Sequence, residues 1–439
     1  MDNLGWRKKT RAGVLLGSEL TMVLAMLAAT AFAQHEQAFP FSGANGAMPI
    51  GELVADGAGN LYGTTFQGGS CDLLQGCGVV FEFTPPQTPG GQWMEATIYT
   101  FKGAPDGSGP NGGLVIDKAN NLYGTTQLGG NQGAGTAFAL SPLSQPGGAW
   151  TETIIHSFDD SPTDGQSPLA GLVSDAAGNL YGTTVSSGSG TPQLGTAFEL
   201  SPPSQPGGTW SETILYNFGA YQGDATGPGA PLIFDSAGNA YGTTAAGGAI
   251  PPGRGTVFEL SPPSQAGGAW TETILHSFSA PNDGFAVSTG LTITPSGALL
   301  GTAPEGGGLN NRGVVFALAP PSSPGGTWNY ALIHTFGAQP DGSTPQSRLT
   351  LLPGKNPVLY GTTQRGGALG DGTVYQLTPP APGGTWTETP IYNFSGGSDG
   401  ASPQAGVIVH DYALYGTTTE GGNTQNCSLG CGTAYRLSH

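Results

Sequence analysis

The chain has 439 residues, and Gly (77) and Pro (36) are so frequent that turns must be numerous. Only 9% of the residues are charged and 37% are hydrophobic, which argues against a disordered chain and against long helices. We therefore expect one all-β architecture of many short strands. The formal net charge of -17 at pH 7 excludes nucleic acid and anionic membrane surfaces as partners, because both would repel the chain.

The first 33 residues have the pattern of a secretory signal peptide. Four basic residues lie between positions 7 and 11, an apolar run extends over 20–33, and Ala31-Phe32-Ala33 offers a cleavage site. The alternative, a retained membrane anchor, needs about 20 apolar residues, and Glu19 interrupts the run. We expect a secreted mature chain, residues 34–439, in the periplasm or outside the cell and without a membrane span. Losing four basic and two acidic residues, from totals of 12 and 29, leaves 8 and 27 and a net charge of -19.

The four cysteines lie in two loops, Cys71 and Cys77 in one and Cys427 and Cys431 in the other. An even number of cysteines in an exported chain favours disulfides. Four cysteines allow three connectivities, of which we expect the local one, Cys71 with Cys77 and Cys427 with Cys431. A zinc site is the alternative, but no His lies close beside either pair.

The sequence LYGTT, or a near copy, occurs seven times along the chain. Its second residue is Tyr62, Tyr123, Tyr181, Tyr241, Leu300, Tyr360 and Tyr415, at intervals of 61, 58, 60, 59, 60 and 55 residues. A period of this length indicates an array of repeated structural units.

Each unit is expected to contain four strands. In the second unit they come in chain order as a short run ending near Asp117, a run around Tyr123, a run around Phe138, and residues 150–158. Asp-x-x-Gly-Asn turns join the first two strands, and Pro-Pro followed by Gly-Gly joins the last two outside the sheet. Such a unit cannot bury both faces alone, so the seven copies predict a seven-bladed β-propeller with four-stranded antiparallel blades over residues 34–439.

The ends of the sequence indicate how the ring closes. The last unit stops at 437–439, directly after its third strand, while residues 35–41 resemble the end of a fourth strand. This alignment places Phe41 in one column with Phe101, Phe158, Phe218, Phe278, Phe336 and Phe394. We expect the N-terminal strand to complete the seventh blade, because closure removes an exposed strand edge.

Alternating strand directions give the propeller two different faces. Loops between second and third strands, together with the connections between units, emerge on what we call the loop face; the uniform turns emerge on the turn face. One column of Asx residues lies on the loop face: Asn45, Asp106, Asp164, Asp224, Asp283, Asp341 and Asp399. Its functional interpretation is a cation or polyhydroxyl site near the mouth of the central channel, with calcium as the candidate ion. The structural interpretation, which we favour, is that Asp-Gly forms ordinary turns.

Other repeated side chains are interpreted as structural. Six tryptophans lead the outermost strands and are expected to pack rather than to stack on sugars: Trp93, Trp150, Trp210, Trp270, Trp328 and Trp386. The same column of the repeat holds His156, His276 and His334 in three units and Tyr99, Tyr216 and Tyr392 in three others. Tyr could not replace a His that acts as a general base, so these histidines are expected to be half-buried packing groups. Recurring acids could supply a pair for glycoside hydrolysis, but their recurrence favours solvation of outer strands: Glu152, Glu212, Glu272 and Glu388, and Glu82, Glu199 and Glu259.

Function is the least determined property of the sequence. It contains no G-x-S-x-G, H-E-x-x-H, Walker or dinucleotide-binding motif, so no catalytic residue is predicted. Our leading hypothesis is a monomeric binding or scaffolding module for a polysaccharide or an envelope or extracellular protein, with no cofactor required. The alternatives are a carbohydrate-active propeller enzyme, a hydrolase or lyase, and a purely structural envelope protein.

The repeat resembles a known family. The segments GTVFELSPP, GGTWTETILHSF and D-x-x-GNLYGTT are similar to the Gloeo_Verruco repeat of bacterial choice-of-anchor tandem-repeat proteins, over nearly all of residues 38–439. This resemblance implies an exported, propeller-like protein of largely unassigned activity, and it brings no catalytic residues. The sequence departs from family members that carry a C-terminal anchoring segment, which puts surface attachment in doubt.

Overall fold

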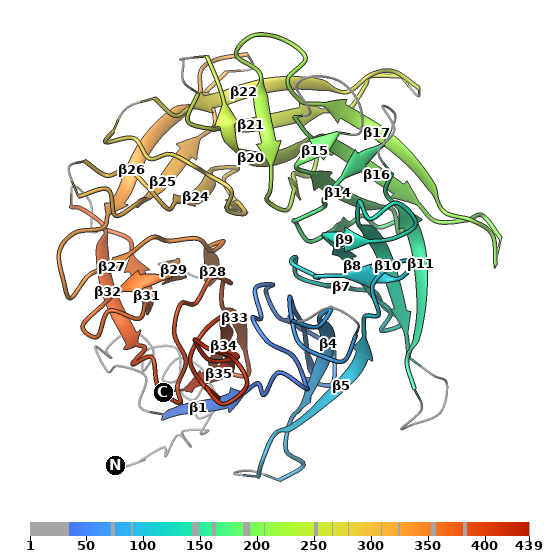
Figure 1. Ribbon diagram of the computed structural model, residues 1–439. Helices are drawn as coiled ribbons and strands as arrows, with labels where there is room; N and C mark the ends of the chain where they lie inside the picture. The colour runs from blue at the N-terminus through green and yellow to red at the C-terminus, as the bar shows by residue number, and fades with distance from the viewer. Residues whose placement is uncertain are drawn as a thin grey trace, which may run out of the picture.

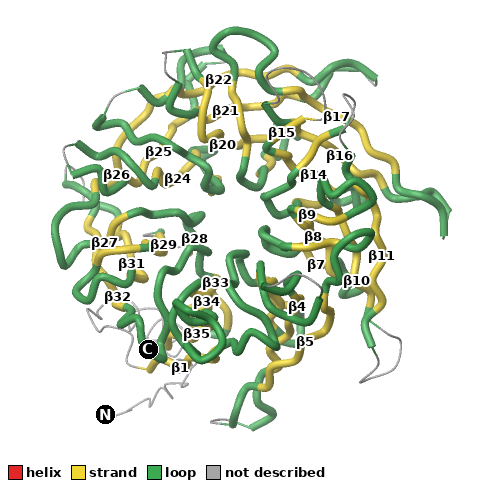
Figure 2. Tube along the Cα trace, in the orientation of Figure 1, coloured by secondary structure: helices red, strands yellow, loops and turns green. Residues whose placement is uncertain are grey.

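A computed structural model describes residues 35–438 except 72–74, 89–90, 143–148, 160–163, 188–193, 206, 250–252, 266, 280, 309, 324, 353–356 and 381–383. The predicted signal segment, residues 1–33, lies outside the described residues. In the described part the chain forms strands and loops only (Figure 2), so no helix there has the length and apolarity needed to span a membrane.

Seven antiparallel sheets follow one another around a ring (Figure 1), which confirms the predicted seven-bladed propeller. The innermost strands of blades 1 to 7 are β2 (Val54–Ala55), β7 (Val115–Ile116), β13 (Val173–Ser174), β19 (Ile233–Phe234), β23 (Thr292–Ile293), β28 (Thr350–Leu352) and β33 (Ile408–His410). The second strands are β3 (Leu61–Thr65), β8 (Leu122–Thr126), β14 (Leu180–Thr184), β20 (Ala240–Gly247), β24 (Leu299–Ala303), β29 (Val358–Thr363) and β34 (Ala413–Thr418).

The third strands are β4 (Val79–Thr84), β10 (Thr136–Ser141), β16 (Thr196–Ser201), β21 (Thr256–Ser261), β25 (Val314–Ala319), β31 (Thr373–Thr378) and β35 (Thr433–Ser438). The outermost strands are β5 (Met94–Thr100), β11 (Thr151–Ser157), β17 (Ser211–Asn217), β22 (Thr271–Ser277), β26 (Asn329–Thr335), β32 (Thr387–Asn393) and, in blade 7, β1 (His35–Pro40). Short strands join loops on the loop face: β6 (Gly107–Ser108) with β9 (Leu128–Gly129), β12 (Gly165–Gln166) with β15 (Ser186–Ser187), β18 (Ala225–Pro228) with β20, and β27 (Gly342–Ser343) with β30 (Arg365–Gly366).

On the turn face, one Asp organises the turn between the first two strands in each of blades 1 to 4, and Thr294 takes its place in blade 5. In blade 1, Asp56 Oδ1 accepts hydrogen bonds from the backbone N–H groups of Ala58 (2.9 Å) and Asn60 (2.8 Å). Its Oδ2 accepts from Asn60 Nδ2 (2.8 Å) and from the Tyr62 hydroxyl (3.2 Å). The same set recurs at Asp117, Asp175 and Asp235. These residues satisfy their own backbone as Asx turns do, so this face offers little unused polar chemistry.

Neighbouring blades are tied together near the channel by the first Thr of each LYGTT strand. Each hydroxyl donates to a backbone carbonyl of the next blade, at distances from 2.8 to 3.4 Å. The pairs are Thr64 with Gly112, Thr125 with Ala170, Thr183 with Ala230, Thr243 with Thr289, Thr302 with Ser347, Thr362 with Ala405, and Thr417 with Pro49. The last pair crosses the point of closure, so the bonds form an unbroken circle.

The predicted closure is confirmed by the pairing of β1 with β35, from His35 opposite Ser438 to Pro40 opposite Thr433. Figure 1 shows the N-terminal strand beside the C-terminal one. The six other outermost strands carry a β-bulge against the third strand, whereas β1 pairs without one. The absence of the bulge shifts the register of β1 by one residue. Glu36 therefore pairs with Leu437, where a bulged strand would place His35; the corresponding pair in blade 2 is Glu152 with Leu140.

Candidate functional site

Three polar columns of the repeat meet at the seams, by which we mean the contacts between the outer parts of successive blades. The first column is the His or Tyr of an outermost strand, the second is the Asx residue after that strand, and the third is the Glu on the outermost strand of the next blade. Phe39 replaces the His or Tyr at seam 7/1, and Tyr330 replaces the Glu at seam 4/5. From seam 7/1 to seam 5/6 the sets are Phe39, Asn45 and Glu95; Tyr99, Asp106 and Glu152; His156, Asp164 and Glu212; Tyr216, Asp224 and Glu272; His276, Asp283 and Tyr330; and His334, Asp341 and Glu388.

Seam 2/3 shows the geometry of such a set. His156 Nε2 lies 3.2 Å from both carboxylate oxygens of Asp164 and 3.7 Å from Glu212 Oε2. Asp164 also accepts hydrogen bonds from the backbone N–H groups of Gly165 (2.7 Å) and Asp159 (3.0 Å). The Asp is therefore the hub of each set, held by its own turn and shared by two blades.

The glutamates of the seams are buried, which corrects the prediction that they solvate the outer strands. The side chain of Glu212 is only 11% exposed, and one oxygen of each of five such acids is buried without a hydrogen-bond partner among the described residues: Glu95, Glu152, Glu212, Glu272 and Glu388. The reason is that successive side chains of the Thr-Glu-Thr sequence point to opposite faces of the strand. In β11 both threonines face solvent, so Glu152 between them points into the seam.

Burial changes the protonation of these acids. It raises the pKa of Glu212, Glu272 and Glu388 to about 8 and the pKa of Glu152 to about 7, and the charge of the adjacent Asp adds to the effect. Burial lowers the pKa of His156, but the hydrogen bond to Asp164 and the charge of Glu212 outweigh it, so the net shift is upward. The seams thus hold groups that bind protons near neutral pH.

The Asx column is placed against the outermost strands. Asp106 Oδ2 accepts hydrogen bonds from the Tyr99 hydroxyl (2.9 Å) and the Lys102 backbone N–H (3.0 Å), and Oδ1 accepts from the Gly107 N–H (2.6 Å). Asp164, Asp224, Asp283, Asp341 and Asp399 make the corresponding contacts in their own blades, and Asn45 bonds Glu95 (2.9 Å). Among the described residues, no potential metal-binding group joins two members of the column. Calcium binding by this column stays a prediction.

The histidines and tryptophans pack as predicted. His156, His276 and His334 lie edge-on against the Phe two residues later, with ring centroids 4.6 to 4.8 Å apart. Trp150 packs against Tyr62 of the preceding blade, and Trp93, Trp210 and Trp328 make similar contacts. What the sequence interpretation missed is the bond from each His to the Asp seven or eight residues later. The constant spacing of seven or eight residues between each His and the following Asp could have indicated this hydrogen bond in advance.

A solvent-open cavity of about 350 Å³ lies at seam 1/2 on the loop face. It is lined by Tyr99, Lys102, Pro105, Asp106, Asn131, Glu152, Ile154 and Ser157. Asn131 comes from the loop between second and third strands and is anchored there by a bond from its backbone N–H to the Ser157 hydroxyl (2.8 Å). The lining combines two carboxylates, an amine, an amide and hydroxyls with an apolar wall.

Both disulfides have the predicted local pairing, Cys71 with Cys77 and Cys427 with Cys431. The first lies in the loop after the second strand of blade 1, and the other lies in the matching loop of blade 7. The two crosslinked loops therefore flank the closure of the ring.

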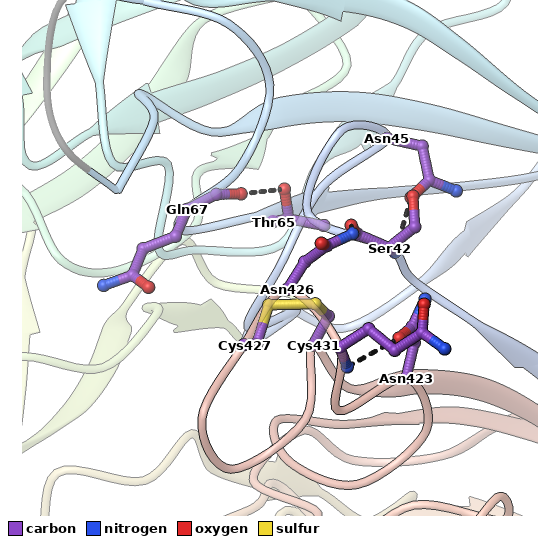
Figure 3. Close-up of a disulfide and its surroundings, with 9 residues drawn as sticks. Ser42, Asn45, Thr65, Gln67, Asn423, Asn426, Cys427 and Cys431 are labelled. Atoms are coloured by element: carbon purple, nitrogen blue, oxygen red, sulfur yellow. Dashed lines mark hydrogen bonds between the residues drawn. A yellow bond between two sulfur atoms is a disulfide. The ribbon is translucent and has the colours of Figure 1, made fainter.

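Between these loops runs a segment that we call the strap, residues 42–49, which leads from β1 to blade 1. Figure 3 shows Asn426, beside the disulfide of blade 7, pointing at Ser42, whose carbonyl oxygen accepts a hydrogen bond from Asn426 Nδ2 (2.7 Å). On the other side, the Ala47 N–H donates to the Gln67 carbonyl of the blade 1 loop (2.8 Å). The strap is thus bonded to both crosslinked loops.

The sequence profile of the Gloeobacter/Verrucomicrobia repeat matches residues 28–205 and 143–356, which together cover more than half of the chain. The chain belongs to this family. No curated protein matches the sequence of this Gloeobacter/Verrucomicrobia repeat protein.

Solved structures share the fold of this family member at low sequence identity. A catalytically inactive variant of virginiamycin B lyase from Staphylococcus aureus, in complex with quinupristin, is 15% identical with a TM-score of 0.52, over 92% of this chain and 99% of that one. The selenomethionine-substituted form of that lyase is 13% identical with a TM-score of 0.51, over the same shares of the two chains. At such identities the likeness concerns the propeller fold alone.

Proposed function

We propose that this Gloeobacter/Verrucomicrobia repeat protein is an exported binding module that holds a neutral glycan in the cavity at seam 1/2. The observation that carries the proposal is the lining of that cavity. Sugar hydroxyls both donate and accept hydrogen bonds, and carboxylate, amide, amine and apolar groups converge here within reach of one small ligand. The net negative charge of the chain disfavours acidic polysaccharides.

The seams themselves offer an internal analogue of the expected contact. At seam 3/4 the hydroxyl of Tyr221 donates to Glu272 Oε2 at 2.9 Å, and Tyr221 comes from the connection on the loop face. At seam 1/2 the corresponding acid is Glu152, which lines the cavity. A ligand hydroxyl at Glu152 would make the same bond that Tyr221 makes at Glu272.

Titration calorimetry of residues 34–439 with neutral plant and bacterial oligosaccharides tests the proposal. Asn131→Ala and Lys102→Ala should each weaken binding about tenfold, as expected for one lost hydrogen bond, because both side chains line the cavity. Glu272→Gln, at seam 3/4, is the matched control and should bind as the parent does. Absence of binding, or equal affinity in all variants, would contradict the glycan site and favour a structural or protein-binding role.

One observation favours a second candidate function, a glycan-cleaving enzyme. The pKa of Glu152 is raised to about 7 by burial, with the charge of Asp106 adding to the shift, so an acid that is partly protonated at neutral pH adjoins a second carboxyl group. This pairing resembles the arrangement used in glycoside hydrolysis. Release of reducing ends from the bound glycan, abolished by Glu152→Gln, would support it; binding without turnover would leave the module as proposed.

A further inference from the structure

We propose that two seams, 2/3 and 5/6, each bind one divalent transition-metal ion of the zinc class through one His, one Asp and one Glu. The two sets are His156, Asp164 and Glu212, and His334, Asp341 and Glu388. In each set the three potential ligand atoms lie within 4.8 Å of one another. The His and Asp belong to one blade and the Glu to the next, so an ion would bridge two blades.

The geometry at seam 2/3 is close to that of a metal site. Ligand atoms about 2.0–2.2 Å from a tetrahedral ion lie roughly 3.4 Å from each other. His156 Nε2 is 3.2 Å from Asp164 Oδ2 and 3.7 Å from Glu212 Oε2. The carboxylate oxygens of Asp164 and Glu212 lie within 4.8 Å of each other, so the three side chains already surround a space where one ion could bind.

Seam 5/6 adds an independent observation. His334 Nε2 lies 3.3 Å from Asp341 Oδ2. Asp341 Oδ1 is buried and has no hydrogen-bond partner among the described residues. Buried carboxylate oxygens without partners are costly unless they bind a proton or a cation. A metal ion would satisfy this oxygen together with the imidazole.

The ligand types select the class of ion. Imidazole nitrogen suits zinc and other first-row transition ions, whereas calcium and magnesium prefer oxygen ligands alone. The side chains at seam 2/3 are 21%, 8% and 11% exposed for His156, Asp164 and Glu212. Each site is thus accessible from solvent at the His, and water could complete the coordination.

The other seams lack part of the set and serve as internal controls. Tyr replaces the His at Tyr99, Tyr216 and Tyr392, and at seam 4/5 Tyr330 occupies the position of the Glu and stacks on His276, with ring centroids 4.1 Å apart. The chain itself therefore contains, at these seams, the substitutions that would remove each ligand while keeping the blade contact. The structure predicts two ions per chain.

The experiment uses residues 34–439 without an affinity tag, freed of metal by a chelator and equilibrated with Zn²⁺ by dialysis, and bound metal is measured by mass spectrometry. We expect two ions per chain and a higher melting temperature with Zn²⁺ than with the chelator. His156→Tyr and His334→Tyr should each remove one ion, and the double variant should remove both. These variants should fold, because Tyr occupies the same position in three other blades.

His276→Tyr, at the seam without the Glu, is the control and should leave both ions in place. A Co²⁺-loaded sample should lose half of its visible absorption in each single variant, which separates loss of an imidazole ligand from loss of folding. The proposal is overturned if Zn²⁺ does not bind, if Ca²⁺ binds in its place, or if His156→Tyr and His334→Tyr each bind as many ions as the parent protein does. Glycan binding at seam 1/2 involves different residues, so either proposal can fail without the other.

Discussion

At the residue scale, each position of the LYGTT strand makes a different contact. In blade 3, Leu180 enters the core and the Tyr181 hydroxyl donates to Asp175 (3.1 Å). Gly182 lies under the ring of Phe198, where an added Cβ would come within 2.5 Å of the ring. Thr183 bonds the next blade and Thr184 bonds the third strand of its own blade. The segment thus makes five separate interactions in blade 3, whereas in blade 5 Leu300 and Ala303 replace the Tyr and the second Thr.

The glycine beneath the aromatic ring should not tolerate a methyl group. In blade 4 a Cβ on Gly242 would lie 2.4 Å from the Phe258 ring, whereas a Cβ on Gly57 would meet nothing within 4 Å. We expect Gly242→Ala to lower the free energy of unfolding by roughly 1–3 kcal/mol, as overpacking does in other cores. Gly57→Ala is the control and should change it little. Urea unfolding measures both, and a fully stable Gly242→Ala protein would contradict this packing.

Two blades carry Tyr where the other five carry Phe at the centre of the core. The hydroxyls of Tyr375 and Tyr435 are buried and have no hydrogen-bond partner among the described residues. Removing an unsatisfied buried hydroxyl should stabilise the protein by about 1 kcal/mol per site. Tyr375→Phe and Tyr435→Phe are therefore expected to raise the melting temperature. A lower melting temperature would mean that the hydroxyls are bonded in solution.

At the element scale, the outermost strands do more than cover the blades. Their alternation sends Thr to solvent and Glu into the seam, where the Glu meets the Asx residue of the preceding blade. This brings together residues 50 positions apart in sequence at Asn45 and Glu95, and 56 apart at Tyr216 and Glu272. The polar clusters are therefore a property of pairs of blades.

These clusters should make stability depend on pH. Burial and the hydrogen bond to Asp224 raise the pKa of Glu272 to about 8 from an ordinary value of 4.5, so between those values the folded state binds more protons than the unfolded state. Stability is therefore expected to fall as the pH rises from about 5 to 8. Because part of the group faces solvent, we expect Glu272 to contribute on the order of 2 kcal/mol to this loss.

The Gln side chain of the Glu272→Gln variant carries no charge at any pH. This variant should therefore show a smaller decrease in the free energy of unfolding between pH 5.5 and pH 8.5 than the parent protein does. Urea unfolding at pH 5.5 and pH 8.5 measures it in both proteins. Equal slopes in the parent and the variant would show that Glu272 ionises normally in the folded state.

The elements were more predictable than the seams. Seven copies of one motif, with turn signals between runs of β-branched and aromatic residues, are enough to predict seven four-stranded blades, and the placement of Phe41 is enough to predict closure. Periodicity aligns residues within columns, but it does not show which columns touch across a seam. It therefore left His156, Asp164 and Glu212 as three separate features, and it gave no sign of the missing bulge in β1.

At the scale of the whole molecule, the ring depends on one strand. β1 covers the edge of β35, and Phe39 of β1 and the nearby Phe41 pack across the closing seam. Phe39 lies 5.1 Å from Phe83 and Phe41 lies 5.0 Å from Phe81, measured between ring centroids. The strap then carries the chain between the two crosslinked loops to blade 1. Without β1 the third strand of blade 7 would present an open edge.

The most direct test of this account is thermal unfolding of residues 42–439, which lack β1, compared with residues 34–439. The closed ring predicts a clearly lower melting temperature for the shorter protein and recovery when a peptide of residues 34–41 is added, because the peptide can pair with β35. A peptide with Phe39 and Phe41 both changed to Ser is the control and should restore little. Equal melting temperatures for the two proteins, with no response to the peptide, would contradict the closure on which every seam described above depends.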